Sequence, residues 1–152
     1  AARRSRRTRA RGRRRQRDDT KASDANETAD VALVPTLKVL ASDGRRVVLN
    51  QVRDYARAGG HILFGTDVGF DPDDSPLREY QLMEAAGLSW RQVLASLTAN
   101  PAIRFRAIDR RGRLAAGMAA DVVVIGTDPR RGASAFADVR YTIRAGRVIS
   151  RH

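Results

Sequence analysis

The sequence lacks cysteine altogether and contains only two histidines, His61 and His152, among 152 residues. Without cysteine the chain can form no disulfide bond and offers no thiolate ligand to a metal ion. The absence also fits a reducing compartment, so we expect a cytoplasmic protein. His152 is the last residue and we expect His61 on the surface, so this chain alone has no site built from several histidine ligands.

Long apolar runs are missing as well. No stretch of about 18 apolar residues occurs, so the sequence predicts no membrane-spanning helix. No apolar segment follows the basic N-terminus, which argues against a secretory signal. The length allows one domain with a buried core, but a complete (β/α)₈ barrel needs at least about 200 residues. The chain is therefore too short to hold such a barrel.

Acidic residues are absent from residues 1–17, which hold ten arginines and account for most of the net charge of +12. Removing those ten from the 29 Lys and Arg leaves 19 basic against 17 acidic residues. Three interpretations of the arginine-rich segment stay open. The first is a solvated polycationic arm that binds polyanions without sequence preference. The second is a targeting segment, and the third is the product of GC-rich DNA translated out of frame.

The middle of the chain has the pattern of a βαβ unit. Residues 31–37 and 61–67 are short, nearly continuous apolar runs, as expected for strands of a parallel sheet. Residues 46–58 follow a helical period between them, and Gly59-Gly60 predicts the helix end. Such crossovers are nearly always right-handed.

Helices and then strands are predicted after this unit. Ser75 followed by Pro76 predicts a helix start, and Ser89 with Gln92 forms a capping box for a second helix that stops near Asn100-Pro101. Leu88 and Val93 have the spacing of a hydrophobic staple. Three short strands follow, the last two joined by a tight turn at Ala145-Gly146; they are residues 121–126, 139–144 and 147–150.

Asp67 is the strongest candidate for a catalytic residue. It ends a buried strand just before Gly69 and a polar loop, and parallel α/β folds build their sites at this edge. A carboxylate there can bind a metal ion or act as a general base. The alternative is that Asp67 only binds backbone amides in the turn.

Other polar residues carry weaker signals. His61 begins the strand that Asp67 ends, and six strand residues span about 20 Å, so these two side chains cannot share a metal ion. The loop contains three carboxylates, Asp71, Asp73 and Asp74, and their partly alternate spacing suggests a calcium-binding loop. The longer EF-hand pattern is absent, so a solvated acidic loop is expected. The sequence has no phosphate-binding glycine-rich motif and no nucleophile elbow.

Several segments, in the right order, resemble the C-terminal part of the amidohydrolase superfamily, in its imidazolonepropionase-like and prolidase-like branch. The sequence FGTDVG at residues 64–69 resembles the last barrel strand, and residues 34–37 resemble the seventh. Further similarities occur at residues 79–82, 86–89, 98–102, 112, 117–124, 128–129 and 144–148. The resemblance covers about residues 31–151.

This resemblance implies an α/β fold made of the last two βα units of a TIM barrel (31–111) and part of the C-terminal β-sandwich (112–152). Residues 1–30 are expected to be a disordered tail and linker. It further implies a metal-dependent hydrolase of non-peptide C–N bonds, in which a divalent metal ion such as zinc activates water. In that family the aspartate of strand eight ligates the metal and transfers the proton, and Asp67 matches it.

The family's histidines on strands one, five and six and its bridging lysine or glutamate have no match here. We therefore expect the C-terminal portion of a small-molecule hydrolase that binds metal poorly and is inactive as this chain. Substrate-binding residues are not identified, and self-association through open edges is expected. The alternative function is a non-enzymatic polyanion-binding protein that acts through the arginine-rich segment; nucleic acid is otherwise not an expected partner.

Overall fold

The computed structural model describes residues 31–40, 45–67, 69 and 75–152. Contacts divide the chain into two units, residues 1–31 and 32–152, and the description below concerns the second. The expectations for residues 1–30 and for Asp71, Asp73 and Asp74 lie outside the described residues. No helix of the described part is both long and apolar enough to cross a membrane.

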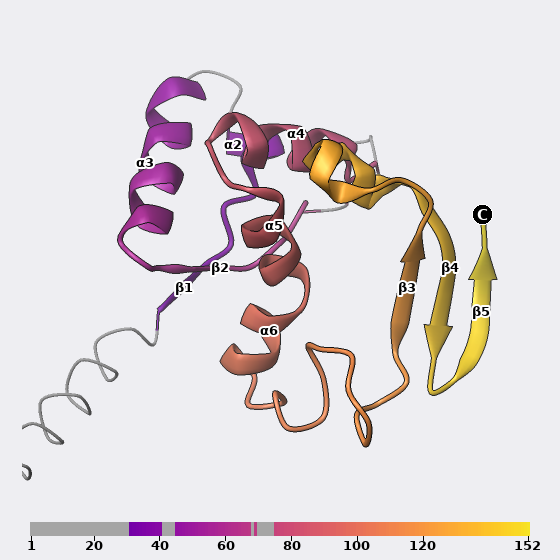
Figure 1. Cartoon of the computed structure of the whole chain (residues 1–152). Coiled ribbons are helices and arrows are strands. Elements are labelled where there is room, and N and C mark those ends of the chain that lie inside the picture. The colour runs from indigo at the N-terminus through magenta and orange to yellow at the C-terminus, as the bar shows by residue number, and fades with distance from the viewer. Residues whose placement is uncertain (1–30, 41–44, 68, 70–74) are drawn as a thin grey trace, which may run out of the picture. The chain divides into compact units, whose positions relative to one another are not determined.

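The predicted βαβ unit is present in shortened form (Figure 1). Strands β1 (Ala32–Leu33) and β2 (His61–Ile62) pair in parallel, and helix α3 (Arg45–Arg57) lies between them in the sequence. The sequence predicted strands over 31–37 and 61–67. Both observed strands are shorter than predicted, with two residues each. The first ends early because Pro35 has no N–H for a ladder and Thr36, at φ 38°, turns the chain into the short helix α2 (Leu37–Leu40), so that β2 also loses its partner after Ile62.

Helices α4 (Leu77–Ala85) and α5 (Trp90–Leu97) follow the predicted starts. The Leu77 N–H donates to Ser75 Oγ at 3.3 Å, although the assigned helix begins one residue after Pro76. Both bonds of the capping box exist: Gln92 N–H donates to Ser89 Oγ at 3.4 Å, and Ser89 N–H donates to Gln92 Oε1 at 2.9 Å. The sequence thus fixes this helix start locally.

Pro101 does not end the second predicted helix. Helix α5 stops at Leu97, and a new helix α6 (Ala99–Arg104) starts two residues later with Pro101 in its first turn. A proline is tolerated there because the N–H groups of a first turn have no intrahelical partner. The end of α5 instead coincides with Thr98, whose backbone leaves the helical region at φ −132°, ψ −81°.

The C-terminal strands form an antiparallel sheet in the order β3-β4-β5, with bounds Val122–Ile125, Val139–Arg144 and Arg147–Arg151. Arg144 pairs with Arg147 across the predicted turn, where Ala145 and Gly146 both have positive φ, 48° and 76°. This is the backbone of a two-residue hairpin turn. The 3₁₀ helices η1 (Pro129–Arg131) and η2 (Ala133–Ala137) connect β3 to β4.

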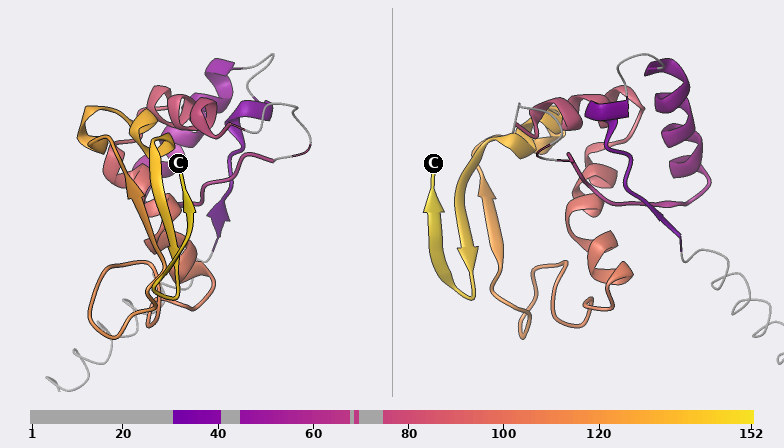
Figure 2. Two further views of the ribbon diagram at one scale, coloured as in Figure 1. Left: turned by 90° about the vertical axis from the view of Figure 1, so that its right-hand side faces the viewer. Right: turned by 180° about the vertical axis from the view of Figure 1, so that it is seen from behind.

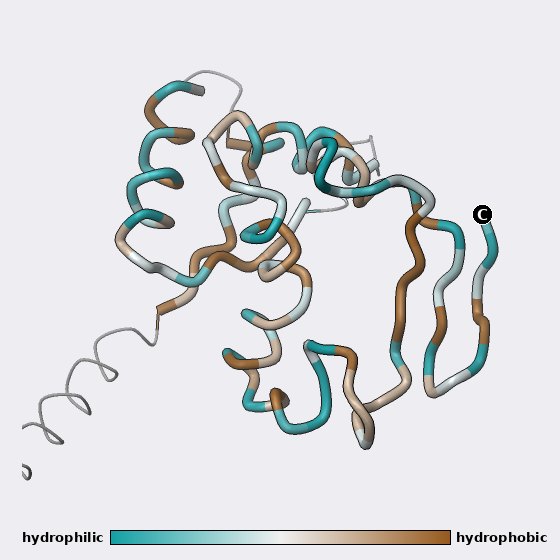
Figure 3. The backbone as a smooth tube through the Cα atoms, in the orientation of Figure 1, coloured by the Kyte–Doolittle hydropathy of each residue, from teal (hydrophilic) through white to brown (hydrophobic). Residues whose placement is uncertain are grey.

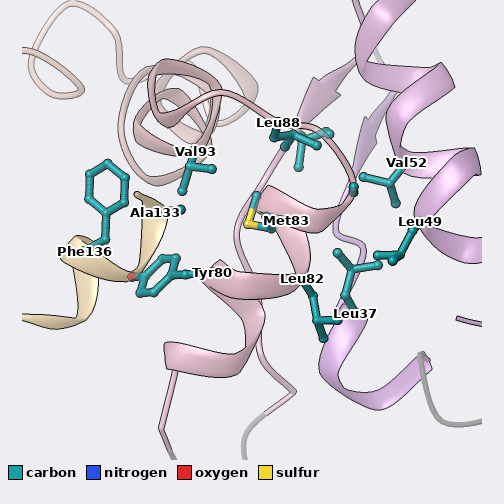
Figure 4. Close-up of a cluster of buried hydrophobic side chains, with 12 residues drawn as sticks. Leu37, Leu49, Val52, Tyr80, Leu82, Met83, Leu88, Val93, Ala133 and Phe136 are labelled. Carbon is teal, nitrogen blue, oxygen red and sulfur yellow. The ribbon is translucent and has the colours of Figure 1, made fainter. Parts of the chain in front are cut away.

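One buried cluster joins the helices to the start of the C-terminal segment (Figure 4). Met83 of α4 has no exposed surface and lies in this cluster. Helix η2 contributes Ala133 and Phe136 to it, which the sequence pattern did not predict. The staple residues Leu88 and Val93 are buried in the same cluster. Its other buried members are Leu37, Leu49, Val52, Ile62, Tyr80, Leu82 and Ala86.

The C-terminal sheet has an apolar face that the described residues leave partly open. Paired residues share a face, and the register places Val122, Val124, Tyr141, Ile143 and Val148 together, with Arg151 paired to Tyr141 at one end of the face. Three of them keep large exposed fractions: 39% for Val124, 42% for Tyr141 and 47% for Val148. Figure 3 shows the apolar character of β3, and Figure 2 shows the three strands from two further sides. We call this set the apolar sheet face.

Replacing Ser89 with Ala removes the side-chain acceptor of the capping box. We expect this change to destabilise the start of α5 by about 1 kcal/mol, because the Gln92 N–H loses its partner. Hydrogen–deuterium exchange of the first turn of α5 measures the effect. Gln81→Ala, at an exposed position of α4, serves as the control. Equal exchange in Ser89→Ala and the native chain would contradict the role of the cap.

Candidate active site

The carboxyl ends of β1 and β2 meet at one edge, which we call the site edge: residues 34–36 and 65–67. Parallel pairing brings them together, since Leu63 N–H still donates to the Leu33 carbonyl at 2.9 Å. Gly65 contacts the neighbouring segment directly. A Cβ atom at this position would lie 2.5 Å from Val34 Cγ1 and 3.7 Å from Thr36 Cγ2. Only glycine therefore lets the two segments approach this closely.

Asp67 ends the site edge with an exposed side chain and a left-handed backbone, at φ 53°. Aspartate tolerates this conformation better than most residues. No described residue donates a hydrogen bond to its carboxylate or forms an ion pair with it. The following turn, residues 68 and 70–74, lies outside the described part, so both interpretations of Asp67 stay predictions.

A metal ion finds no complete set of ligands in the described residues. They contain no group of three or more His, Asp or Glu side chains that would hold one. His61 lies at the start of β2, and Asp67 lies beyond the other end of this strand. The expected metal ligand Asp67 is thus a single carboxylate, which does not fit a metal site by itself.

Glu79 is a polar residue of this region that the sequence analysis did not select. Its side chain is fully buried and accepts two backbone hydrogen bonds from the residues just after the site edge. Leu37 N–H donates to Oε1 at 2.9 Å and Lys38 N–H donates to Oε2 at 2.7 Å. The sequence did contain a signal for the burial of Glu79, because the helical spacing places this residue on one face with Leu82, Met83 and Ala86.

Burial raises the pKa of Glu79 above its ordinary value of 4.5, and the two N–H donors and the charge of Lys38 oppose this rise without cancelling it. The folded chain therefore binds the proton more tightly than the unfolded chain. The stability that this group contributes is fully present below pH 4.5 and is lost as the pH rises through the higher folded value.

We expect the native chain to gain stability relative to the Glu79→Gln variant as the pH falls from about 8 to about 4. Denaturant unfolding of both proteins across this range measures the difference. The difference between the two proteins removes the contributions of other titrating groups to the pH dependence of stability. Asp128 is one such group, because a hydrogen bond from Arg130 lowers the pKa of Asp128 to about 2. A relative loss of stability on acidification would contradict the raised pKa.

Aromatic rings and two long-range hydrogen bonds support the strand that leads to the site edge. Phe64 stacks on Tyr80 with ring centroids 4.7 Å apart, and Tyr80 contacts Phe136 of η2 at 5.8 Å. Burial raises the pKa of Tyr80 to about 12, so this hydroxyl stays protonated. Phe64 N–H donates to the Ser96 carbonyl at 3.1 Å, and Asn100 Nδ2 donates to the Ile62 carbonyl at 2.9 Å.

A sequence profile described as the amidohydrolase family matches residues 2–150, nearly the whole chain. The chain belongs to the amidohydrolase family. The resemblance seen in the sequence is thereby confirmed. A search among curated proteins found no significant match for this amidohydrolase chain.

Three solved structures with similar folds illustrate the likeness. A Xaa-Pro dipeptidase with bound methionine has a TM-score of 0.69 at 20% identity over 79% of this chain and 34% of its own. A protein described as a prolidase from Bifidobacterium longum has 0.64 at 28% identity over 79% and 35%. The A. niger ochratoxinase has 0.64 at 22% identity over 79% and 32%. The amidohydrolase chain thus spans about a third of these proteins.

Proposed function

We propose that the chain is the C-terminal part of a metal-dependent amidohydrolase that hydrolyses amide or cyclic amide C–N bonds of small molecules. Family membership over residues 2–150 carries this proposal. The position of Asp67 supports it, because this exposed carboxylate lies on the segment that follows β2, beyond the carboxyl end of a parallel pair. In the complete enzyme Asp67 is the proposed catalytic residue and metal ligand.

The proposal also concerns which class of C–N bond the complete enzyme hydrolyses. The sequence resemblance implied C–N bonds other than peptide bonds, whereas one structural neighbour is called a Xaa-Pro dipeptidase. A dipeptide and an N-acyl amino acid therefore both belong in the test. The metal ion, when bound in a complete enzyme, supplies an activated water molecule. The described residues of this chain would contribute one ligand and a proton acceptor through Asp67, and we expect the chain alone to be inactive.

A chimera tests this proposal. Residues 31–151 replace the corresponding C-terminal third of the B. longum prolidase-like protein, and hydrolysis of Xaa-Pro dipeptides and N-acyl amino acids is measured with added zinc. We expect metal-dependent turnover by the chimera, loss of at least about 100-fold with Asp67→Asn, and no turnover by the native chain alone.

The matched control is Asp109→Asn, an exposed carboxylate far along the sequence from the site edge, which should leave turnover unchanged. Turnover that survives Asp67→Asn would refute the assigned role of Asp67. Saturable, zinc-dependent turnover by the native chain would instead refute its expected inactivity. Titration of the native chain with DNA at several salt concentrations tests the alternative function, and no measurable affinity at low salt would eliminate it.

A further inference from the structure

We infer that Glu79 is a positioning residue for Asp67: from helix α4 it fixes the backbone of residues 36–38, and through the contact of this segment with Gly65 it fixes the backbone that presents Asp67. The inference concerns the same site as the proposed function and rests on it for the importance of Asp67. The conformational coupling itself is independent of any activity.

The first step is the contact between Glu79 and helix α2. Both carboxylate oxygens accept a backbone N–H, from Leu37 at 2.9 Å and from Lys38 at 2.7 Å, across 42 and 41 residues of sequence. Hydrogen bonds to a carboxylate are shorter and stronger than those between neutral groups. Glu79 has no exposed surface, so water does not compete with these two donors for its carboxylate oxygens. Glu79 therefore holds the start of α2 against α4.

The second step is the unusual backbone of Thr36. It immediately precedes the two bonded residues and has φ 38°, a conformation that a β-branched residue adopts at a cost in energy. Such a conformation persists only where the surroundings impose it. Residues on both sides of Thr36 are held: Leu37 and Lys38 by Glu79, and Val34 by its close contact with Gly65. The bonds to Glu79 thus help to impose the strained turn.

The third step leads from Thr36 to Asp67. The Thr36 methyl group and the Val34 side chain lie against Gly65, two residues before Asp67. Asp67 itself has a left-handed backbone, at φ 53°. If Thr36 relaxed to negative φ, its side chain and that of Val34 would change their position against Gly65. The backbone at Asp67 would then lose the packing that defines it.

The experiment uses the full chain with Glu79→Gln and Glu79→Leu. The Gln variant keeps one acceptor oxygen and the shape of the side chain, whereas the Leu variant removes both acceptors. Amide exchange at Leu37 and Lys38 is measured together with the Cα and Cβ chemical shifts of Thr36 and Asp67, which report the sign of φ. These shifts are read in solution, or in the sedimented state if the chain self-associates.

We expect exchange at Leu37 and Lys38 to become at least about tenfold faster in Glu79→Leu, since a hydrogen bond to a charged group is lost at each. We also expect the shifts of Thr36 and Asp67 to leave their left-handed values, while Val93 in α5 is unchanged. Glu79→Gln should show the same changes to a smaller extent, with exchange accelerated chiefly at one of the two residues, the one that faces the amide nitrogen. Glu84→Gln, an exposed position on the same helix, is the matched control and should change none of them.

Rescue separates positioning from simple stabilisation. Glycine adopts positive φ without strain, so Thr36→Gly added to Glu79→Leu should restore the closer contact, that of Val34 with Gly65, and with it most of the Asp67 shift change. The lost hydrogen bonds and the Thr36 methyl contact are not restored. Faster exchange at Leu37 and Lys38 with unchanged Asp67 shifts would overturn the inference and leave Glu79 as a local helix cap. If Glu79→Leu does not fold, the same criteria apply to Glu79→Gln. Failure of Asp67→Asn in the chimera would refute the proposed function without affecting these results.

Discussion

At micromolar concentration the full chain is expected to self-associate, and charges placed on the apolar sheet face are expected to weaken this association at least about tenfold. Val124 and Val148 keep 39% and 47% of their surface exposed on this face, next to Tyr141. Water contact with apolar surface costs about 25 cal/mol per Å², and a second copy can cover it. Sedimentation velocity of the Val124→Lys, Val148→Lys double variant measures the change.

The opposite face of the same strand offers the control. Val123 is 58% exposed, more than Val124, but it pairs with Thr142 rather than with an apolar neighbour. Val123→Lys should therefore leave the association nearly unchanged. A native chain that stays monomeric at about 100 µM, or equal effects of lysine on both faces, would contradict the assignment of the apolar sheet face as the site of contact.

Met83→Ala is expected to cost about 2–5 kcal/mol of the free energy of unfolding, enough to unfold much of a marginal chain. Met83 has no exposed surface, and the other members of its buried cluster come from α2, α3, β2, α4, α5 and η2 and from the turn after α4. Truncation of the Met83 side chain leaves a cavity, because the surrounding elements cannot all move inward to fill it. Denaturant unfolding, or loss of exchange protection across α4 and α5, measures the cost.

Leu77→Ala is the matched control on the same helix. Leu77 is also apolar, but it is 38% exposed and lies outside the buried cluster. We expect a cost of less than about 1 kcal/mol there. Equal costs at the two positions would mean that α4 does not pack on the cluster through the face that includes Met83.

Local signals predicted the elements whose causes are local. Helix α3, the capping box at Ser89 and the hairpin at Ala145-Gly146 were predicted correctly, because each depends on residues within a few positions. Helix α2 and the early end of β1 were not predicted. Their cause is the left-handed turn at Thr36 and the bonds from Glu79, which lies more than 40 residues away along the chain.

The residues of the candidate site also divide into those with a local signal in the sequence and those without one. The sequence selected Asp67 as the end of a strand over residues 61–67, whereas β2 ends at Ile62, and the role of Asp67 stays a prediction. The contact of Gly65 with Val34 and the burial of Glu79 require the parallel pairing and the packing of α4, which no short pattern contains. A glutamate on the apolar face of a predicted helix was the available signal, and it identifies burial without identifying the partner.

The two sheets also differ in how they can assemble. Arg144 meets Arg147 across a two-residue turn, whereas Ala32 meets His61 only after helix α3 has closed a long loop. Hairpins form within microseconds, while the pairing of distant strands must first overcome the entropy of loop closure. The C-terminal hairpin is therefore expected to form early once synthesised, and the parallel pair late. During synthesis β1 leaves the ribosome before β2, so the pairing of these two strands waits until helix α3 and β2 have been made.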